Sequence, residues 1–300
     1  MAATQRDADT IRVATRPSPQ ARTQAQAVAD AITAATSRPC ELVFIESTGD
    51  VRAEVPLHQM AGQGIFVKEV QRAVLDGRAD VAVHSAKDLP TEGDPGLVIG
   101  AWCARRDPRD ALIGRRLADL GPGATVATGS ARRRAQLRAA RPDIGFAELR
   151  GNIGTRLERI PENGAIVMAV AALEILGLTD RVAELLDPTQ FVPMIGQGCV
   201  AVEHRFGDGA VRDALSAIDD LASRRAVETE RAFLAVLGSG CSLPVGAHVD
   251  AEGIITTFLA EADAPGARSV VMQADVSDPD TSRLVAAELA RVSRREVSGR

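Results

Sequence analysis

The sequence of residues 81–90 is VAVHSAKDLP, and it predicts the end of a buried strand within an α/β fold. The short apolar run is typical of a buried strand, and the polar residues after it stop at a proline. Lys87 and Asp88 therefore lie side by side at the carboxyl end of a strand, where open α/β sheets bind ligands. An ordinary surface ion pair is the alternative. The position favours a functional carboxylate, with Ser85 as its hydrogen-bonding neighbour.

Strand-like and helix-like segments alternate on both sides of this stretch. Ser18 and Pro19 predict a helix start, because Ser caps helices and Pro suits the first helical position. The alternation implies right-handed crossovers, mostly parallel sheets and an α/β fold. The predicted strands are 11–15, 42–45, 80–83, 125–127, 146–149 and 165–170, and the main predicted helices are 20–35, 66–75 and 130–140.

The chain is long enough for more than one domain. A return segment at 200–203 is expected to pair back into the first unit, so the chain crosses between two units near 103–107 and 193–199 and forms a hinge. After residue 221 a helix, three strands and a closing helix predict a small α+β domain. The predicted domains are 1–102 with 199–217, then 107–193, and finally 221–300.

Composition excludes several functional classes. The net charge of −5 and the aromatic content of 3% argue against nucleic-acid binding. The four cysteines lie far apart without CxxC spacing, so a zinc site is not expected. No apolar run approaches the length needed to cross a membrane, and residues 1–10 lack an apolar secretory core. We therefore expect a cytoplasmic protein with reduced thiols and no membrane partner.

Eight arginines lie within residues 132–159, and guanidinium groups bind carboxylates in a two-pronged, permanently charged geometry. Arg132 and Arg133 follow a predicted helix start, where backbone N–H groups also attract anions. Arg150 and Arg156 flank a glycine-containing turn, and Arg16 precedes Ser18 in a similar place. A solvated basic face is the alternative, and it is the preferred interpretation for Arg134, Arg138, Arg141 and Arg159.

A lone cysteine, Cys241, lies in the loop sequence GSGCS at residues 238–242. Thiolate is the strongest side-chain nucleophile near neutral pH, so an accessible cysteine suits covalent attachment. Without further evidence, a single cysteine more often has a structural role than a catalytic or cofactor-binding one. Cys40, Cys103 and Cys199 lie in or beside apolar segments, and we expect them to be core residues.

Seven segments, in order along the chain, resemble those of the porphobilinogen deaminase (hydroxymethylbilane synthase) family. They are IRVATRPSP (11–19), GIFVKE (64–69), HSAKDLP (84–90), DPRDA (107–111), LRGNIGTRL (149–157), GQG (196–198) and GCSLPVG (240–246). The resemblance implies two periplasmic-binding-protein-like lobes plus the small C-terminal domain. It also implies a cytoplasmic, monomeric transferase of tetrapyrrole (haem) biosynthesis that passes its product to uroporphyrinogen III synthase.

The resemblance also assigns roles to residues. Cys241 matches the cysteine that carries a dipyrromethane cofactor through a thioether, and Asp88 matches the catalytic aspartate. The implied reaction joins four porphobilinogen molecules head to tail and releases ammonia and hydroxymethylbilane, with Asp88 stabilising the cationic azafulvene. The remaining matched residues would contact cofactor or substrate: Arg16, Ser18, Ser85, Lys87, Thr128, Ser130, Arg132, Arg133, Arg150, Arg156 and Gln197.

Three features depart from the family pattern. Gln59 and Gln63 replace lysines that are frequent in a predicted flap at 49–64, and Gly129 replaces the usual serine between Thr128 and Ser130. Ile175 stands where the family normally has a ligand-binding arginine, and losing such a guanidinium removes about 1.5–3 kcal/mol of charged hydrogen bonding. The alternative hypothesis is therefore a degenerate paralogue that binds pyrrole polycarboxylates without turnover.

Overall fold

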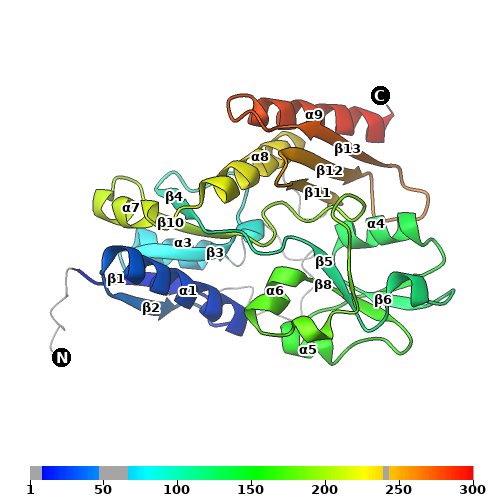
Figure 1. Ribbon diagram of the computed structural model, residues 1–300, viewed down its shortest axis with the longest axis horizontal. Coiled ribbons are helices and arrows are strands. Elements are labelled where there is room, and N and C mark those ends of the chain that lie inside the picture. Colours follow the sequence, from blue (N-terminus) through cyan, green and yellow to red (C-terminus); the bar gives the residue numbers. More distant parts are fainter. Residues whose placement is uncertain (1–8, 47–66, 239–242, 300) are drawn as a thin grey trace.

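The computed structural model describes residues 9–46, 67–238 and 243–299. Three sheets organise this part of the chain: two of five strands and one of three strands. Figure 1 shows the first five-stranded sheet at the left, the second at the right and the three-stranded sheet above them. The α/β prediction is confirmed, and the small third unit is the predicted α+β unit, whose three strands form an antiparallel sheet.

The first sheet has the order β2-β1-β3-β10-β4. The strands β2, β1 and β3 run parallel, whereas β10 runs antiparallel to both β3 and β4. The sheet is therefore mixed rather than mostly parallel, because β10 returns from the second lobe and enters between two strands of the first. The strands are β1 (Ile11–Thr15), β2 (Cys40–Phe44), β3 (Val81–Ser85), β4 (Leu97–Trp102) and β10 (Val200–Arg205).

Helix α1 (Pro19–Thr36) begins where the sequence predicts, and the Ser18 hydroxyl accepts a hydrogen bond from the Ala21 N–H at 3.3 Å. Its buried face packs against β1, β2 and β3 in the core of the first lobe, which includes Val13 and Ile32. The other helices of this lobe are α3 (Lys68–Leu75) and α7 (Gly209–Ser216).

The second sheet repeats the pattern of the first, with the order β7-β6-β8-β5-β9. Strands β7, β6 and β8 are parallel, and β5 is antiparallel to both β8 and β9. The strands are β5 (Asp110–Ile113), β6 (Thr125–Ala127), β7 (Gly145–Ala147), β8 (Ala165–Ala169) and β9 (Glu184–Leu185); the helices are α4 (Ala131–Ala140), α5 (Ile153–Leu157) and α6 (Val170–Ile175).

The two crossings between the lobes lie against each other. The Arg106 N–H donates to the Gly198 carbonyl at 3.0 Å, and the Cys103 N–H donates to the Val200 carbonyl at 2.9 Å. Gly198 has a φ of +88°, and a Cβ there would lie 2.5 Å from the Arg106 carbonyl oxygen. Only glycine therefore permits this close approach of the two crossings.

The third unit consists of α8 (Leu221–Leu237), β11 (Val245–Val249), β12 (Ile254–Ala260), β13 (Ser269–Asp275) and α9 (Ser282–Ser298). Its strands are antiparallel, and both helices cover the face of the sheet that buries Phe233 and Ile255. All three sheets fall within the three predicted ranges, although the domain boundaries themselves stay predictions. No helix in the described ranges has the length and apolar character needed to cross a membrane.

Candidate functional site

A short turn carries Lys87 and Asp88 at the carboxyl end of β3, as the sequence predicts. The strand ends at Ser85, and a 3₁₀ turn (Ala86–Asp88) follows it directly. The Ala86 N–H donates to the Cys199 carbonyl at 2.9 Å, which fixes the turn to the second crossing. Within the described ranges the half-buried Asp88 carboxylate makes no hydrogen bond or ion pair, so its oxygens are available to a ligand.

Cations from the second lobe surround this turn. Burial lowers the pKa of Lys87; Asp88 opposes that shift, whereas Arg133 and Arg156 add to it. Burial likewise lowers the pKa of Arg156, and Arg133 and Arg150 add to the effect while Asp88 opposes it. Lys87 and Arg156 therefore each lie within electrostatic range of Asp88 and Arg133, and Arg150 lies within electrostatic range of Arg156. We call these five residues the charged cluster.

Arg150 and Arg156 are positioned by the turn between β7 and α5. Asn152 caps α5 by accepting from the Thr155 N–H at 3.0 Å. The Arg156 Nε donates to the Gly151 carbonyl at 2.8 Å, which leaves its terminal nitrogens uncommitted. In the described part of the chain, Arg150 makes no hydrogen bond or ion pair. Both guanidinium groups are therefore available to carboxylates of a ligand.

Arg132 and Arg133 converge instead on a residue that the sequence did not single out, Asp110. Arg132 Nη2 and Arg133 Nη2 lie 2.8 Å and 2.7 Å from its two carboxylate oxygens, and Gln197 Nε2 donates to it at 2.8 Å. Asp110 is 1% exposed; burial alone would raise its pKa, but the two guanidinium groups hold that pKa well below its ordinary value. Asp110 lies in the DPRDA segment at 107–111, one of the seven segments that resemble the family.

Both neighbouring arginines also donate to backbone carbonyls. The guanidinium of Arg132 is buried and also donates to the Val192 carbonyl at 2.5 Å. Arg133 donates to the Val167 carbonyl at 3.1 Å, and the buried Nε atoms of both arginines have no partner within the described residues. Arg132, Arg133 and Gln197 together hold Asp110 in place, and Arg133 also lies within electrostatic range of Lys87 and Arg156. Ligand contacts of Arg132 and Gln197 stay predictions.

The hydroxyl groups of four residues that were predicted to contact a ligand form hydrogen bonds within the protein. Besides Ser18, the Ser130 hydroxyl accepts from the Arg133 N–H at 3.4 Å and so caps α4. The Thr128 hydroxyl accepts from the Ser130 N–H at 3.3 Å, and the Ser85 hydroxyl donates to Gln24 at 3.1 Å. Capping and packing explain these contacts, and ligand contacts by the same residues stay predictions.

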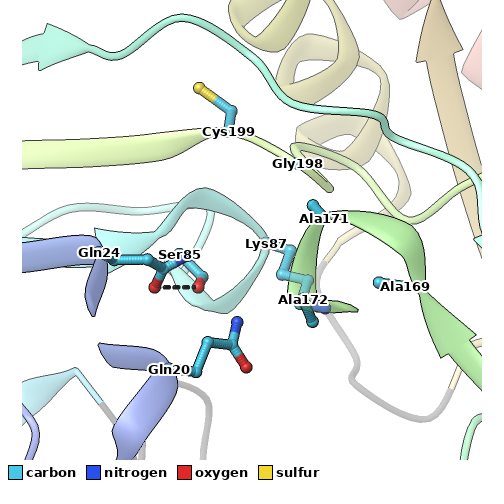
Figure 2. A pocket seen from close by; sticks show the side chains of 9 residues that line it. All are labelled: Gln20, Gln24, Ser85, Lys87, Ala169, Ala171, Ala172, Gly198 and Cys199. Atoms are coloured by element: carbon cyan, nitrogen blue, oxygen red, sulfur yellow. Dashed lines mark hydrogen bonds between the residues drawn. The ribbon is translucent and has the colours of Figure 1, made fainter. Parts of the chain in front are cut away.

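A small pocket marks where the two lobes meet (Figure 2). Its lining includes Ser85 and Lys87 from the first lobe, and Ala171 and Ala172 from α6 of the second. The cavity measures about 10 Å³, which is room for about one water molecule. Lys87 lies alongside the two alanines, so α6 approaches the turn that carries Asp88. Ile175, which replaces the expected arginine, ends this helix and is half-buried.

The thiols that the structure describes are poor nucleophiles. Burial raises the pKa of Cys103 to about 11 and that of Cys199 to about 12, and it also raises the pKa of Cys40. Cys199 is buried, but Cys40 and Cys103 are only partly buried, so the expected core position holds fully for one of the three. Cys241 lies outside the described residues, as do Gln59, Gln63 and the predicted flap. Arg16 is half-buried immediately before α1.

Two family models match the chain. The one described as porphobilinogen deaminase, dipyromethane cofactor binding domain, matches residues 11–213, and the porphobilinogen deaminase C-terminal domain matches residues 225–293. The porphobilinogen deaminase of Acidothermus cellulolyticus is 45% identical over 298 residues, which is 94% of this chain and 88% of the relative. A probable porphobilinogen deaminase of Methanopyrus kandleri is 45% identical over 249 residues, covering 81% and 84% respectively.

Solved structures give only distant likenesses. The methionine binding protein MetQ is 11% identical with a TM-score of 0.46, covering 75% of this chain and 96% of that protein. Immunogenic lipoprotein A from Vibrio vulnificus is 12% identical with a TM-score of 0.44, covering 73% of this chain and 99% of that protein. These scores add nothing to the fold that the strand order defines.

Proposed function

The chain belongs to the porphobilinogen deaminase family, and from this premise we propose that it is an active transferase, a hydroxymethylbilane synthase. In this proposal it condenses four porphobilinogen molecules, releases ammonia at each step and finally releases the linear product. The observation that carries the proposal is the charged cluster, in which the Asp88 carboxylate, unpaired in the described ranges, lies beside Lys87 of its own lobe and within electrostatic range of Arg156 of the second lobe.

The charged cluster fits a group that carries several carboxylates. The guanidinium groups of Arg150 and Arg156, with terminal nitrogens uncommitted in the described part, would hold such carboxylates bidentately. A dipyrromethane attached to Cys241 would supply a tethered, nucleophilic pyrrole carbon. Because the family model that matches residues 11–213 is that of a dipyromethane cofactor binding domain, the cofactor is part of the family assignment. Its attachment at Cys241 is part of the proposal.

Asp88 is proposed to act by electrostatic stabilisation. When the C–N bond of porphobilinogen breaks and ammonia leaves, the remaining pyrrole becomes cationic. The Asp88 carboxylate would stabilise this charge and accept a hydrogen bond from the pyrrole N–H, since its oxygens have no protein partner in the described ranges.

The alternative, a paralogue that binds without turnover, rests on Ile175. This side chain leaves α6 without the family's guanidinium beside the pocket. Arg133, Arg150 and Arg156 remain in the cluster, so one lost contact of about 1.5–3 kcal/mol lowers affinity rather than removing the chemistry. We therefore favour the active enzyme.

The test compares Asp88→Asn with Glu92→Gln, which alters an exposed carboxylate four residues further along. Asp88→Asn should retain the fold by circular dichroism and lose about 10²–10³-fold in kcat, the usual effect of removing one electrostatic stabiliser. Glu92→Gln should turn over porphobilinogen at the parent rate. If the parent protein itself binds porphobilinogen but releases no ammonia, the non-catalytic alternative replaces this proposal.

The cellular setting is also part of the proposal. We expect the enzyme to act as a monomer in the cytoplasm and to pass its linear product to uroporphyrinogen III synthase, which would close the ring. Light scattering coupled to size exclusion tests the monomer directly: a single species at the mass of one chain supports it, and a dimer mass contradicts it.

A further inference from the structure

A second cavity, of about 370 Å³, lies behind the turn that carries Asp88. It is lined by Leu89 and Pro90 of the turn, by one end of β4 and by one face of α8. Its volume falls within the range of small-molecule sites, whereas the inter-lobe pocket of Figure 2 measures about 10 Å³. Among the described residues the two cavities share no lining side chain.

The charged side chains of this cavity differ in whether they have an oppositely charged partner. Glu203 is paired with His84 at 3.1 Å and accepts from Gln71 at 2.9 Å. Arg224 and Glu228 pair with each other at 3.0 Å, and each has a further ionic partner.

Arg231 differs from these residues. No carboxylate lies within ion-pair distance of it in the described ranges, and it donates only to backbone carbonyls, those of Pro90 at 2.7 Å and Thr91 at 3.3 Å. Burial lowers the pKa of Arg231, and the nearby carboxylates of Glu203 and Glu228 oppose that shift. A half-buried guanidinium at a cavity wall, whose hydrogen bonds in the described ranges go only to backbone carbonyls, can donate to the carboxylate of a ligand.

The rest of the lining selects the kind of anion. Leu89, Leu97 and Ile99 give the cavity apolar walls, and the Arg231 guanidinium lies 5.9 Å from the ring centre of Trp102. Glu203 and Glu228 repel any anion, and they would repel a doubly charged group such as phosphate more strongly than a single carboxylate. We propose that this cavity is a second ligand site, which binds a small molecule with a single carboxylate on an apolar body.

The same guanidinium connects the cavity to the site of chemistry. Through Pro90 and Thr91, Arg231 holds the segment that begins two residues after Asp88. A bound carboxylate competes with these carbonyls for the guanidinium and so loosens the turn. The occupant therefore lowers kcat without competing with porphobilinogen, whose predicted contacts lie between the lobes.

Binding is tested on the full-length holoprotein with dansylglycine, whose carboxylate and aromatic body match the cavity. The dansyl group accepts excitation energy from Trp102, the single tryptophan of the chain, so binding is measured as quenching of Trp102 fluorescence. Quenching of Trp102 should saturate with one probe per chain and persist in excess porphobilinogen. Dansylamide, which lacks the carboxylate, should bind at least tenfold more weakly. Displacement of the probe by porphobilinogen would overturn the proposal, because it would place the probe in the inter-lobe site.

Variants identify the site. Arg231→Gln should weaken dansylglycine at least tenfold, whereas Arg225→Gln, at an exposed position on the same helix, should leave the affinity unchanged. Val98→Phe serves as an independent variant: Val98 lines the cavity and is 40% exposed, so a larger side chain blocks the mouth without entering the core. Unchanged affinity in either Arg231→Gln or Val98→Phe refutes the assignment.

Turnover tests the coupling separately from the proposed function. In the parent enzyme, dansylglycine should lower kcat at least twofold with KM unchanged, and in Val98→Phe it should have no effect. A rise in KM at constant kcat, or saturated binding without any change in kcat, contradicts the coupling through Arg231. If porphobilinogen is not turned over at all, the proposed function fails, while the quenching experiment still decides whether this cavity is a ligand site.

Discussion

Replacing Asp110 by Asn tests the structural core of the site most sharply. Asp110 is the only carboxylate within 4 Å of Arg132 and Arg133 in the described ranges, and it also accepts from Gln197. Asn is nearly isosteric but neutral, and its NH₂ group would face one of the two guanidinium groups as a second donor. The substitution therefore leaves one cation 5% exposed and another nearly as buried, without a counter-charge.

The expected cost follows from this geometry. Removing one partner of a buried ion pair typically costs about 3–5 kcal/mol, because an uncompensated buried charge remains. Asp213→Asn is the matched control, since Asp213 lies 2.8 Å from Arg212 but both side chains are about two-thirds exposed. An exposed pair of this kind contributes only about 0–1 kcal/mol.

Urea unfolding at pH 7.5, followed by far-ultraviolet circular dichroism, measures both variants. Asp110→Asn should lower the free energy of unfolding by about 3–5 kcal/mol, and Asp213→Asn by no more than about 1 kcal/mol. The depressed pKa of Asp110 adds a pH test: its contribution is present above the unfolded pKa of about 3.9 and is lost as the pH falls below it. The difference between parent and Asp110→Asn should therefore shrink in acid. Equal costs for the two variants at pH 7.5 would refute the reasoning.

Other predictions follow from local contacts. Arg105 holds the pKa of Glu230 at about 2, although burial alone would raise it. Glu230 should therefore stabilise the fold above about pH 4.5, and this contribution should be lost as the pH falls toward 2. Urea unfolding of Glu230→Gln should lack this part of the acid dependence. Ser130→Ala should lower the free energy of unfolding by about 1 kcal/mol through loss of the α4 cap, and a change below about 0.3 kcal/mol would contradict the capping role. In the native protein, Cys103 and Cys199 should resist iodoacetamide at pH 8 and react only in urea, as peptide mass mapping would detect.

Local signals predicted much of the fold because each depends on neighbouring residues. Ser18 with Pro19, and Ser130 before the arginines, gave the starts of α1 and α4 correctly. The apolar run before Ser85 predicted β3 and the position of Asp88. Strand β5 (Asp110–Ile113) was missed because four residues that begin with a carboxylate show no apolar periodicity. Strand β4 (Leu97–Trp102) was missed although its sequence is apolar, because a glycine interrupts it.

The sequence predicted which residues form the charged cluster, but it did not predict all the contacts that their side chains make. The sequence grouped Arg132 with Arg133, since both open the same helix. Their side chains both bind Asp110, some twenty residues earlier in the chain, because it becomes buried beside α4 when β5 pairs with β8. Arg231 was likewise not identified, since its contact with the Pro90 carbonyl spans 141 residues. Such pairings depend on tertiary structure, which no local pattern encodes.

The central claim is that a chain of pyrroles grows from Cys241 beside Asp88. Intact mass of the purified protein, before and after a brief exposure to porphobilinogen, tests this claim most directly. The parent protein should carry two covalent pyrrole units and gain further units stepwise, whereas Cys241→Ser should have the mass of the bare chain under both conditions. A parent protein at the bare mass, or a Cys241→Ser protein with the same added mass as the parent, would contradict the account.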